Sequence, residues 1–356
     1  MGHNFFLSDG VEVRNKFIHN LAVSTMPAFS LLNTDQTPAS FWITNPNNEF
    51  VGNHAAGAEE YGFWFDLPAH PTGASSSSHI CPVGVKLGTF AHNVAHSNGR
   101  YGLRIFSEHT PRTYPCGETH IVPTLDVGLA EDEAFSQNPP IQAVYSDFLS
   151  YKNERAGVIA DKLGAVGFER ITTADNIQAG IEITLPGYAK LGQSYLKDAL
   201  IVGMSENYGH AENFTQTKGV VTGQRDSFYY EKVHFQDFNK ASDLKTSLAA
   251  IGTCSHCTVS FDSDGLANTH VFNQISFNNV TYRIKYTSTY RSTILYSVDG
   301  SLVPETSGER YLTGSKLHLY GLDKKCTLDL SLDHSAICTK AIRKLLFTQV
   351  KPKEIL

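Results

Sequence analysis

A pattern of residues that recurs along the first half of the chain limits the folds open to it. Residues 53–65 and 93–106 share an asparagine, an alanine, a Tyr-Gly pair and an apolar run at identical offsets. Shorter versions, with an asparagine ahead of a glycine, recur at residues 153–159 and 176–183, where the two glycines lie 23 residues apart. Spacings of roughly 20–50 residues are typical of solenoid proteins, so we predict a stack of repeated coils.

Such a unit fits one coil of a parallel β-helix. Its glycine would take a tight corner that needs a positive φ, and the apolar run would form a short strand facing the interior. An asparagine repeated at one corner can hydrogen-bond from coil to coil at the spacing of neighbouring strands, about 4.8 Å. We therefore assign the repeated asparagines a structural role and predict an all-β parallel β-helix with loop insertions.

Composition agrees with an all-β solenoid. The 356 residues are 41% hydrophobic, enough for a sizeable core, and only 18% are charged. We expect coils over residues 1–210, and a continuation with a C-terminal cap or small β extension over residues 211–356. Longer insertions at residues 67–82 and 107–140 are expected on the binding side, and residues 339–347 fit either a helix or a strand. Short strands are expected at residues 5–7, 11–13, 40–44, 62–65, 102–106, 141–145, 158–159, 180–184, 199–202, 228–235 and 271–277, and residues 294–301 are expected to be a strand that runs into an Asp-Gly turn.

The charge balance argues against nucleic acid and membrane spans. The net charge is -6 and the isoelectric point is about 6.2, and no Lys/Arg cluster alternates with aromatic residues as in single-strand binders. No apolar run reaches the length of a membrane span, and the first residues lack the basic and apolar regions of a signal peptide. Two sequons, at Asn213 and Asn279, suit a secreted glycoprotein.

The six cysteines admit two interpretations. Cys81 and Cys116 bracket two successive loops, and Cys326 and Cys338 bracket a short one, so we expect two local disulfides. A single Cys-x-x-Cys motif also permits a zinc site. Its ligands would be the two C-terminal cysteines together with Cys254, His256, Cys257 and His334.

Other cofactor motifs give no support for a bound group, and no cofactor is expected. Residues 262–265 resemble the start of a calcium-binding loop, but its twelfth position is Asn273 instead of glutamate, which favours a β-turn. The sequence contains no P-loop, no dinucleotide fingerprint, no His-Glu-x-x-His and no nucleophile elbow. Nucleotide, zinc-protease and α/β-hydrolase chemistry are therefore not indicated.

Several segments together resemble one extracellular family, that of fibrocystin-L, the cell-migration-inducing hyaluronan-binding protein and the transmembrane cell-surface hyaluronidase. The resemblance runs in order from about residue 3 to about residue 340, is specific up to Phe106, and is thinner after residue 190. The segments that carry it are residues 30–48, 55–57, 62–65, 70–73, 95–98, 297–301 and 311–313.

This resemblance implies a right-handed parallel β-helix, a pectin-lyase-like solenoid, in proteins that are secreted or held at the cell surface by one membrane span. The region follows a signal peptide, a glycine-rich β domain and earlier coils in that family. It therefore implies a partner in the form of upstream coils, because a helix that starts at mid-coil exposes an unpaired sheet edge.

Carboxylates near the start of the chain are the first candidates for chemistry. Glycoside cleavage generally uses two carboxylates on either side of the scissile bond. Residues 3–10 match the family motif His-Asn-Phe-Phe-x-x-Asp-Gly, which makes Asp9 or Glu12 a candidate general acid or base with His3 beside it. In the alternative interpretation Asp9-Gly10 is a turn and Glu12 is a solvated strand position. Other acidic pairs are Glu59 with Glu60 and Asp262 with Asp264.

Basic residues of the repeat form a second candidate site. Arginine side chains bind carboxylates through charge-assisted hydrogen bonds, as a uronic-acid polymer would require. Trp42 could stack on sugars, whereas Trp64 lies in an apolar strand and is expected in the core. The basic residues that could line a cationic groove are His54, His92, His96, Arg100 and Arg104.

Two functions from different classes follow from these residues. The first is a non-enzymatic extracellular β-helix segment that binds a polysaccharide or a surface protein, or has an adhesive or structural role. The second is a polysaccharide-cleaving enzyme of the hyaluronidase type. Convergence of Asp9, Glu12, His54, His96 and Arg104 on one groove would favour the enzyme.

Overall fold

The structure is a computed structural model. It describes residues 2–28, 36–117, 136–186, 192–207, 218–223, 228–239, 248–253, 269–286, 293–314 and 326–342. The described residues form β-strands in two sheets and two short 3-10 helices, η2 (Gly73–Ser75) and η3 (Pro82–Gly84). Sheet A is parallel throughout and consists, in order, of β1 (Phe5–Phe6), β4 (Ala39–Ile43), β7 (Tyr61–Asp66), β10 (Tyr101–His109), β13 (Ala156–Leu163), β16 (Ala179–Leu185), β18 (Lys218–Thr222), β20 (Ala249–Thr253) and β23 (Ile284–Lys285).

Sheet B wraps the other sides of the solenoid. Its parallel strands are β2 (Lys16–Ile18), β3 (Leu21–Val23), β5 (Glu49–Val51), β6 (His54–Ala56), β8 (Thr89–Ala91), β9 (Val94–His96), β11 (Ala143–Ser146), β12 (Leu149–Tyr151), β14 (Val166–Glu169), β15 (Thr172–Ala174), β17 (Tyr195–Val202), β19 (Tyr229–Phe238), β21 (Thr269–Asn273) and β22 (Ser276–Val280). Four strands that include antiparallel pairs follow: β24 (Ile294–Ser297), β25 (Arg310–Gly314), β26 (Cys326–Asp329) and β27 (Ser335–Cys338).

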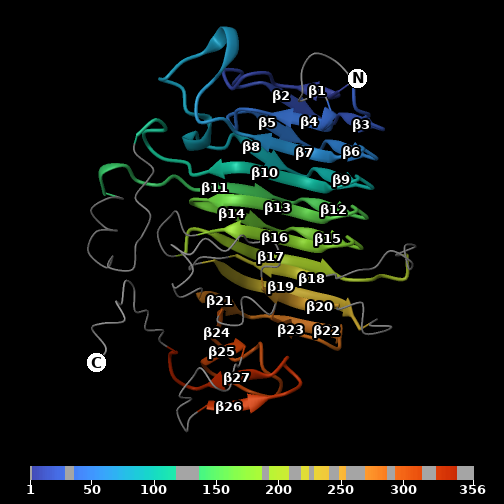
Figure 1. The fold of residues 1–356 in the computed structure, drawn as a ribbon, viewed down its shortest axis with the longest axis vertical. Coiled ribbons are helices and arrows are strands. Elements are labelled where there is room, and N and C mark those ends of the chain that lie inside the picture. Colours follow the sequence, from blue (N-terminus) through green and yellow to red (C-terminus); the bar gives the residue numbers. More distant parts are fainter. Residues whose placement is uncertain are drawn as a thin grey trace, which may run out of the picture.

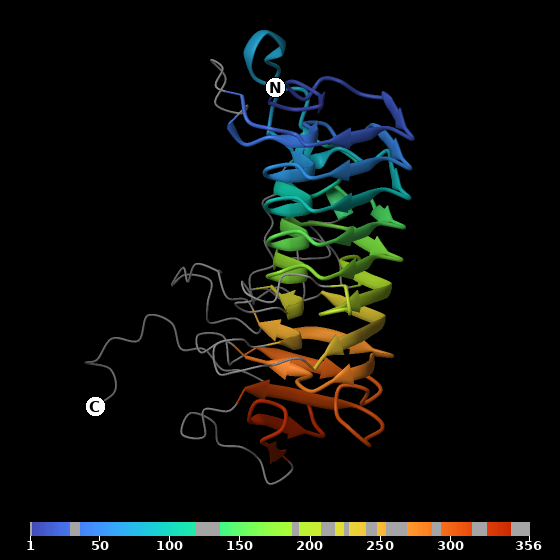
Figure 2. The same cartoon turned by 90° about the vertical axis from the view of Figure 1, so that its right-hand side faces the viewer.

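Each coil contributes one strand to sheet A and then two segments to sheet B, as β4, β5 and β6 do (Figures 1 and 2). The coils stack in register, so that Phe63 pairs with Phe41 of the coil before it and with Leu103 of the coil after it. The prediction of an all-β parallel β-helix is therefore confirmed. No helix within the described ranges has the length and hydropathy of a membrane span.

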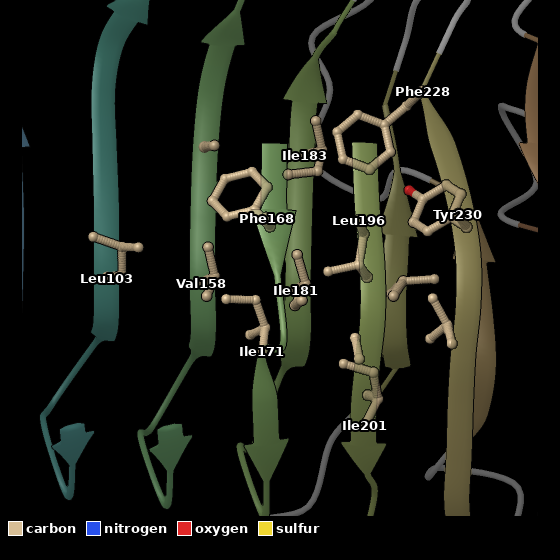
Figure 3. Packing of buried hydrophobic residues seen from close by; sticks show 14 of the residues in the cluster. Leu103, Val158, Phe168, Ile171, Ile181, Ile183, Leu196, Ile201, Phe228 and Tyr230 are labelled. Atoms are coloured by element: carbon tan, nitrogen blue, oxygen red, sulfur yellow. The ribbon is translucent and has the colours of Figure 1, made fainter. Parts of the chain in front are cut away.

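One continuous hydrophobic core fills the interior between the sheets. Figure 3 shows aliphatic residues of sheet A strands, including Val158 and Ile181, facing Phe168 and Leu196 of sheet B. Aromatic side chains stack from coil to coil, with ring centroids 4.7 Å apart for Phe5 and Phe41 and 4.6 Å apart for Phe41 and Phe63. Burying an aromatic ring stabilises the fold by roughly 3 kcal/mol, so each coil depends on its neighbours.

Asparagines stack at the corners of the coils, as the repeat predicts. At one corner Asn53 donates its side-chain amide to Asn93 Oδ1 at 3.0 Å. At another corner Asn98 donates to Asn153 at 2.8 Å, and Asn153 donates to Asn176 at 2.8 Å. All five side chains are buried, so these ladders satisfy polar groups that water cannot reach. The structural role predicted for the repeated asparagines is confirmed.

The glycines of the repeat have a different role from the one expected. Gly62, Gly102, Gly157 and Gly180 lie inside strands and do not have a positive φ. A Cβ atom at Gly102 would lie 2.0 Å from Ser150 Oγ and 2.7 Å from the Gly157 carbonyl oxygen. The position requires glycine because neighbouring chain segments approach closely, and the expectation of a tight corner was wrong.

Two strand predictions need correction. Residues 11–13 form no strand, because the Glu12 carboxylate accepts backbone hydrogen bonds from Ser8 at 3.0 Å and Gly10 at 3.3 Å and so closes a turn. Residues 271–277 divide into β21 and β22 around Gln274, which has a φ of 55°. Most of residues 339–347 lie outside the described residues.

The C-terminal part of the fold changes from parallel to antiparallel pairing. β24 still pairs in parallel with β21, but β24 pairs antiparallel with β25, and β27 pairs antiparallel with both β25 and β26. A disulfide between Cys326 and Cys338 joins β26 to β27. Antiparallel strands at the end of a solenoid cover its open sheet edge.

Candidate functional site: the outer face of sheet A

The side chains of sheet A that point away from the core form an unusual polar and aromatic layer, here called the outer face of sheet A. Strand alternation creates it, since Phe63 and Phe65 enter the core whereas Trp64 and Asp66 point outward. Its apolar part is a second cluster that does not join the main core. The outer face comprises Trp42, Tyr61, Trp64, Asp66, Tyr101, Arg104, Phe106, Ile159, Asp161, Glu182, Lys218 and Val221.

Three arginines converge on two tyrosines at this face, and we call Tyr61, Arg100, Tyr101, Arg104 and Arg155 the arginine–tyrosine cluster. Arg100 and Arg104 both donate to the Tyr61 hydroxyl oxygen, at 3.1 Å and 2.9 Å. The tyrosine rings stack with centroids 5.9 Å apart. A hydrogen bond to Tyr101 raises the pKa of Arg155, and its guanidinium lies 6.0 Å from the Tyr101 ring centroid. Cation–π contacts therefore hold three positive charges together.

Arg104 is the most enclosed of the three arginines. Its guanidinium carbon lies 4.4 Å from the Phe106 ring centroid and 4.9 Å from that of Trp64. Within the described ranges, neither Arg104 nor Arg155 has a carboxylate at ion-pair distance, whereas Arg100 forms a salt bridge with Glu60. The salt bridge with Glu60 therefore balances only one of the cluster's three positive charges.

The acidic groups around this cluster are held toward their neutral forms. Burial raises the pKa of Asp66 to about 6, against an opposing effect of Arg104. Burial also raises the pKa of Asp161, Glu60 and Glu182. Lys218 lies beside Glu182, and burial lowers the pKa of this lysine. Desolvation disfavours each charged form, and groups perturbed in this way often mark functional sites.

Buried polar atoms without partners lie on the same face. Within the part of the chain that the structure describes, Trp64 Nε1, Arg104 Nε and Asp161 Oδ2 are buried and have no hydrogen-bond partner. Trp64 itself is 7% exposed. Buried polar groups are normally satisfied, so unsatisfied atoms that lie close together point to a missing polar partner such as water or a ligand.

The histidines expected to line a cationic groove lie on a different side of the molecule. His54 is on β6 and His96 is on β9, both in sheet B, and His92 is at the corner between the sheet B strands β8 and β9. His96 stacks on Tyr151 with ring centroids 4.6 Å apart, and burial lowers its pKa. The structure therefore brings Arg100 and Arg104 together but does not bring these histidines to them.

The first coil holds the other expected catalytic residues, and His3 packs against Trp42 of the outer face, with ring centroids 4.4 Å apart. His3 Nδ1 accepts a hydrogen bond from the Ala39 backbone at 3.0 Å, and its ring stacks on Phe6. The Glu12 carboxylate caps the turn that contains Asp9. These contacts correspond to the structural alternative for Asp9 and Glu12. Asp9, Glu12, His54, His96 and Arg104 do not converge on one groove.

The tryptophans are both enclosed. Trp42 is 4% exposed and lies between His3 and Trp64, with ring centroids 4.4 Å from each. It does not face solvent as a sugar-stacking residue would, because the next strand's tryptophan covers it. Trp64 is buried, but in the outer cluster and not in the main core.

The expected disulfides are present. Cys81 pairs with Cys116 and Cys326 with Cys338, so these sulfur atoms are not metal ligands. His70 lies near the first pair, with Nδ1 3.3 Å from Cys81 Sγ. Asn279 is exposed at β22 and donates to Asp237 at 2.6 Å. The remaining proposed positions lie outside the described residues: Asn213, Cys254, His256, Cys257 and residues 262–265.

The sequence prediction of the site does not include several residues of the outer face. Tyr61 and Tyr101 enter it only as markers of the repeat. Arg155 precedes Ala156-Gly157 just as Arg100 precedes Tyr101-Gly102, so the repeat offset was a signal that could have identified it. Asp66 and Asp161 had no such signal, because each directly follows an apolar strand residue without any shared motif.

Comparison with known proteins agrees with the fold. Residues 1–103 match the family model described as CEMIP beta-helix. Fibrocystin-L from Mus musculus is 34% identical over 262 residues, which cover 71% of this chain and 6% of the relative. The cell surface hyaluronidase CEMIP2 from Homo sapiens is 31% identical over 268 residues, which cover 64% of this chain and 18% of the relative.

A third relative is the cell migration-inducing and hyaluronan-binding protein from Homo sapiens. It is 30% identical over 244 residues, which cover 59% of this chain and 18% of that protein. The chain thus spans less than a fifth of the length of these relatives. It is a homologue of fibrocystin-L and of the CEMIP proteins, and it carries the CEMIP β-helix in residues 1–103.

Proposed function

We propose that this chain is a β-helix segment of an extracellular or cell-surface protein and that it binds an acidic polysaccharide through the arginine–tyrosine cluster. The observation that carries the proposal is the convergence of three guanidinium groups on one tyrosine pair, with one salt bridge to Glu60. Two relatives support the ligand class, since their names describe a hyaluronidase and a hyaluronan-binding protein.

The chemistry of the cluster matches a polymer of uronic acids. A guanidinium presents several N–H donors in a planar fork, which suits the two oxygens of a carboxylate. Arg100 and Arg155 stand at the start of successive sheet A strands, β10 and β13, and Arg155 is exposed. Neighbouring strands lie about 4.8 Å apart, so a chain crossing the coils would meet one cation after another.

The raised pKa values of the acidic side chains near the cluster support binding of an anion. Burial raises the pKa of Asp66, Asp161 and Glu60, and each is thereby less able to neutralise the arginines. A polysaccharide carboxylate would supply the missing charge. The expected attraction is electrostatic and falls as salt is added.

The direct test is the affinity of the purified 356-residue chain for hyaluronan oligosaccharides, measured by calorimetry at several salt concentrations. Arg155→Gln is expected to weaken binding about tenfold, the effect of one charge-assisted contact. Arg170→Gln is the matched control, because Arg170 is also exposed but lies on sheet B in a salt bridge with Asp147. Equal losses in both variants, or none in Arg155→Gln, would refute the assigned site.

A further inference from the structure

Two insertions leave the solenoid side by side, where the paired strands β7 and β10 end. Residues 67–88 follow β7 and fold back over the first coil, so that a Cβ atom at Gly10 would lie 3.0 Å from Pro82 Cγ and 3.2 Å from Pro68 Cγ. Residues 110–117 follow β10. Figures 1 and 2 show the first insertion rising above the first coil at the N-terminal end of the solenoid. The proposed polysaccharide site uses neither insertion.

Backbone contacts hold the two insertions together independently of their disulfide. The Thr110 N–H donates to the Val83 carbonyl oxygen at 2.8 Å, and the Arg112 N–H donates to the Gly84 carbonyl oxygen at 3.0 Å. The backbones approach so closely that a Cβ atom at Gly84 would lie 2.2 Å from the Pro115 carbonyl oxygen. None of these contacts involves a cysteine, so we expect the two segments to stay in place when the bond between the sulfur atoms is broken.

A histidine lies beside the disulfide that joins the insertions. His70 Nδ1 is 3.3 Å from Cys81 Sγ, and the ligand atoms of His70, Cys81 and Cys116 all lie within 4.8 Å of one another. Nδ1 also lies 3.2 Å from the Ile80 carbonyl oxygen, which holds the ring in this position. Cys81 is buried, whereas Cys116 and His70 are exposed. Among the described residues, no other three ligand atoms of histidine, cysteine or acidic side chains lie so close together.

The spacing of these atoms suits a tetrahedral zinc ion once the disulfide is reduced. Zinc lies about 2.3 Å from a thiolate sulfur and about 2.0 Å from an imidazole nitrogen, so tetrahedral angles place the sulfur and the nitrogen about 3.5 Å apart. His70 Nδ1 and Cys81 Sγ are already close to this separation. The two thiolates of such a site lie roughly 3.8 Å apart. Side-chain rotation can provide this separation, because the Cα atoms of Cys81 and Cys116 are 5.1 Å apart.

We propose that the Cys81–Cys116 disulfide is a redox-gated zinc site, in which reduction releases two thiols that bind Zn²⁺ together with His70 and a water molecule. A thiolate of a dithiol reductant attacks the exposed Cys116 sulfur, the bond between the cysteine sulfurs breaks, and Cys81 leaves as a thiolate that takes up a proton. The second thiol of the reductant then displaces Cys116, and the reductant becomes a disulfide. Two electrons and two protons pass to the cysteines, and zinc binding releases both protons.

The second described disulfide provides an internal reference. Cys326 and Cys338 are in register on the antiparallel strands β26 and β27. Within the described ranges, no histidine or carboxylate completes a group of three ligand atoms with these sulfurs. Reduction of this pair therefore yields two thiols without a third ligand, and we expect no zinc to bind there. This inference does not depend on polysaccharide binding.

Cysteine alkylation tests the site directly. The purified 356-residue chain is reduced with dithiothreitol, which is then removed under nitrogen, and is treated with iodoacetamide with and without Zn²⁺. Mass spectrometry measures the alkylation rate of each cysteine. Zinc should slow alkylation of Cys81 and Cys116 at least about tenfold, because a metal-bound thiolate is a poor nucleophile. Alkylation of Cys326 and Cys338 should not change.

Two histidine variants separate a metal ligand from a bystander. His70→Ala removes the nitrogen ligand and should raise the zinc concentration needed to protect Cys81 and Cys116 about 100-fold. His79→Ala is the matched control, because His79 is exposed on the same insertion and contacts Ser77 through its backbone N–H. Its protection should equal that of the wild type. Circular dichroism of each chain, oxidised and reduced, checks that the solenoid is retained.

A disulfide that only links the two insertions is the competing explanation. It predicts that Cys81 and Cys116 of the reduced chain are alkylated at the same rate with and without zinc, and this result would overturn the proposal. Protection that survives unchanged in His70→Ala would overturn the assigned ligand set. A solenoid that unfolds on reduction would also overturn the proposal, since the backbone contacts would then not hold the ligands in place.

Discussion

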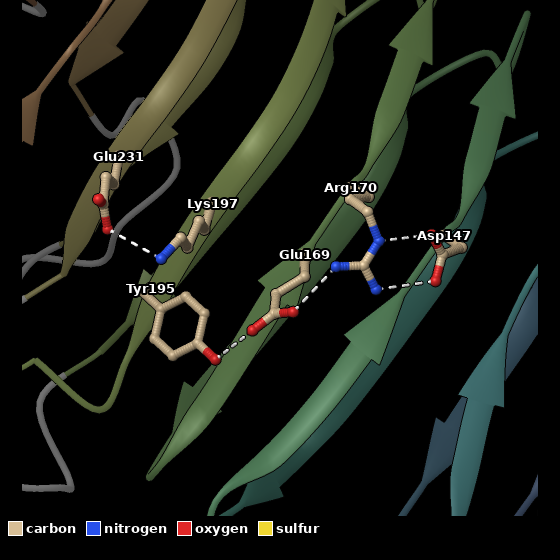
Figure 4. A network of polar contacts seen from close by, with 6 residues as sticks. All are labelled: Asp147, Glu169, Arg170, Tyr195, Lys197 and Glu231. Atoms are coloured by element: carbon tan, nitrogen blue, oxygen red, sulfur yellow. Dashed lines mark hydrogen bonds and ion pairs between the residues drawn. The ribbon is translucent and has the colours of Figure 1, made fainter.

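The outer face of sheet A and the outer side of sheet B belong to the same coils but differ in how their charged side chains are paired. On sheet B, Arg170 donates to both oxygens of Asp147, at 2.7 Å and 3.0 Å, and also contacts Glu169 (Figure 4). Figure 4 also shows Tyr195 donating to Glu169 and Lys197 facing Glu231. On sheet A, Arg104 is enclosed by aromatic rings and has no such carboxylate partner among the described residues.

This contrast shows how one fold can separate a structural surface from a reactive one. The salt bridges on sheet B lie in water, where each charge is screened and paired, so they contribute little to stability or chemistry. On sheet A the charges have lost water without gaining full partners, and burial raises the pKa of the carboxyl groups there. We therefore expect a charged ligand to bind more strongly to sheet A than to sheet B.

The largest predicted difference is between the unfolding free energies lost when Arg104 on sheet A and Arg170 on the sheet B side are each replaced by alanine. Arg104→Ala removes a charge that favours the ionised forms of Asp66 and Asp161, together with packing against Trp64 and Phe106. It should cost about 3 kcal/mol of unfolding free energy. Arg170→Ala, on the exposed side of sheet B, should cost much less. Urea unfolding of both variants at neutral pH measures the difference. Similar losses would mean that the two faces do not differ in desolvation.

The second prediction concerns how an Asp→Asn replacement changes the melting temperature, which should rise on sheet A and fall on the sheet B side. Burial raises the pKa of Asp66 to about 6, above its unfolded value of 3.8, so the folded state binds more protons between these values and loses stability as pH rises through them. Asp66→Asn should therefore raise the melting temperature relative to wild type, and by more at about pH 7 than at about pH 5.

Asp147 should behave in the opposite way. The hydrogen bond from Arg170 lowers the pKa of Asp147 below 3.8, so its contribution is fully present above that value and is lost only in acid. Asp147→Asn should lower the melting temperature by the same amount at about pH 5 and about pH 7. Thermal unfolding of Asp66→Asn and Asp147→Asn at both pH values checks these two predictions. Melting temperatures that change in the same direction in both variants would contradict the contrast between the two faces.

The smallest predicted effect concerns the sequon on sheet B. Asn279 is exposed at β22, so a glycan can be attached there without disturbing the core. Secretion from mammalian cells of an Asn213→Gln variant should yield protein whose gel mobility increases after glycosidase treatment. The further change Asn279→Gln should abolish that shift with little change in stability. A shift that persists would show that this position is not modified.

The repeat made the fold predictable from the sequence. Asn53, Asn93, Asn98, Asn153 and Asn176 stack as expected, because a coil-to-coil hydrogen bond requires the same side chain at the same corner. The role of Gly102 was not predictable in the same way, since it depends on how closely Ser150 approaches from another strand. Such approaches are a property of the packed coils and not of local sequence.

The candidate site was predictable only in part. Arg100 and Arg104 lie together as expected, but His96, from the neighbouring part of the same coil, does not join them. The corner between β9 and β10 turns the chain from sheet B to sheet A, which separates their side chains. Asp66 and Asp161 lie on the same face only because β7, β10 and β13 pair as successive strands of sheet A.

The central claim is that the arginine–tyrosine cluster on sheet A, and not sheet B, binds the acidic polysaccharide. Arginine modification by phenylglyoxal, read residue by residue by mass spectrometry, tests this in a single unmutated sample. With hyaluronan oligosaccharides present, modification of Arg100 and Arg155 should slow severalfold while that of Arg170 stays the same. Protection of Arg170 with continued modification of Arg100 and Arg155 would contradict the claim.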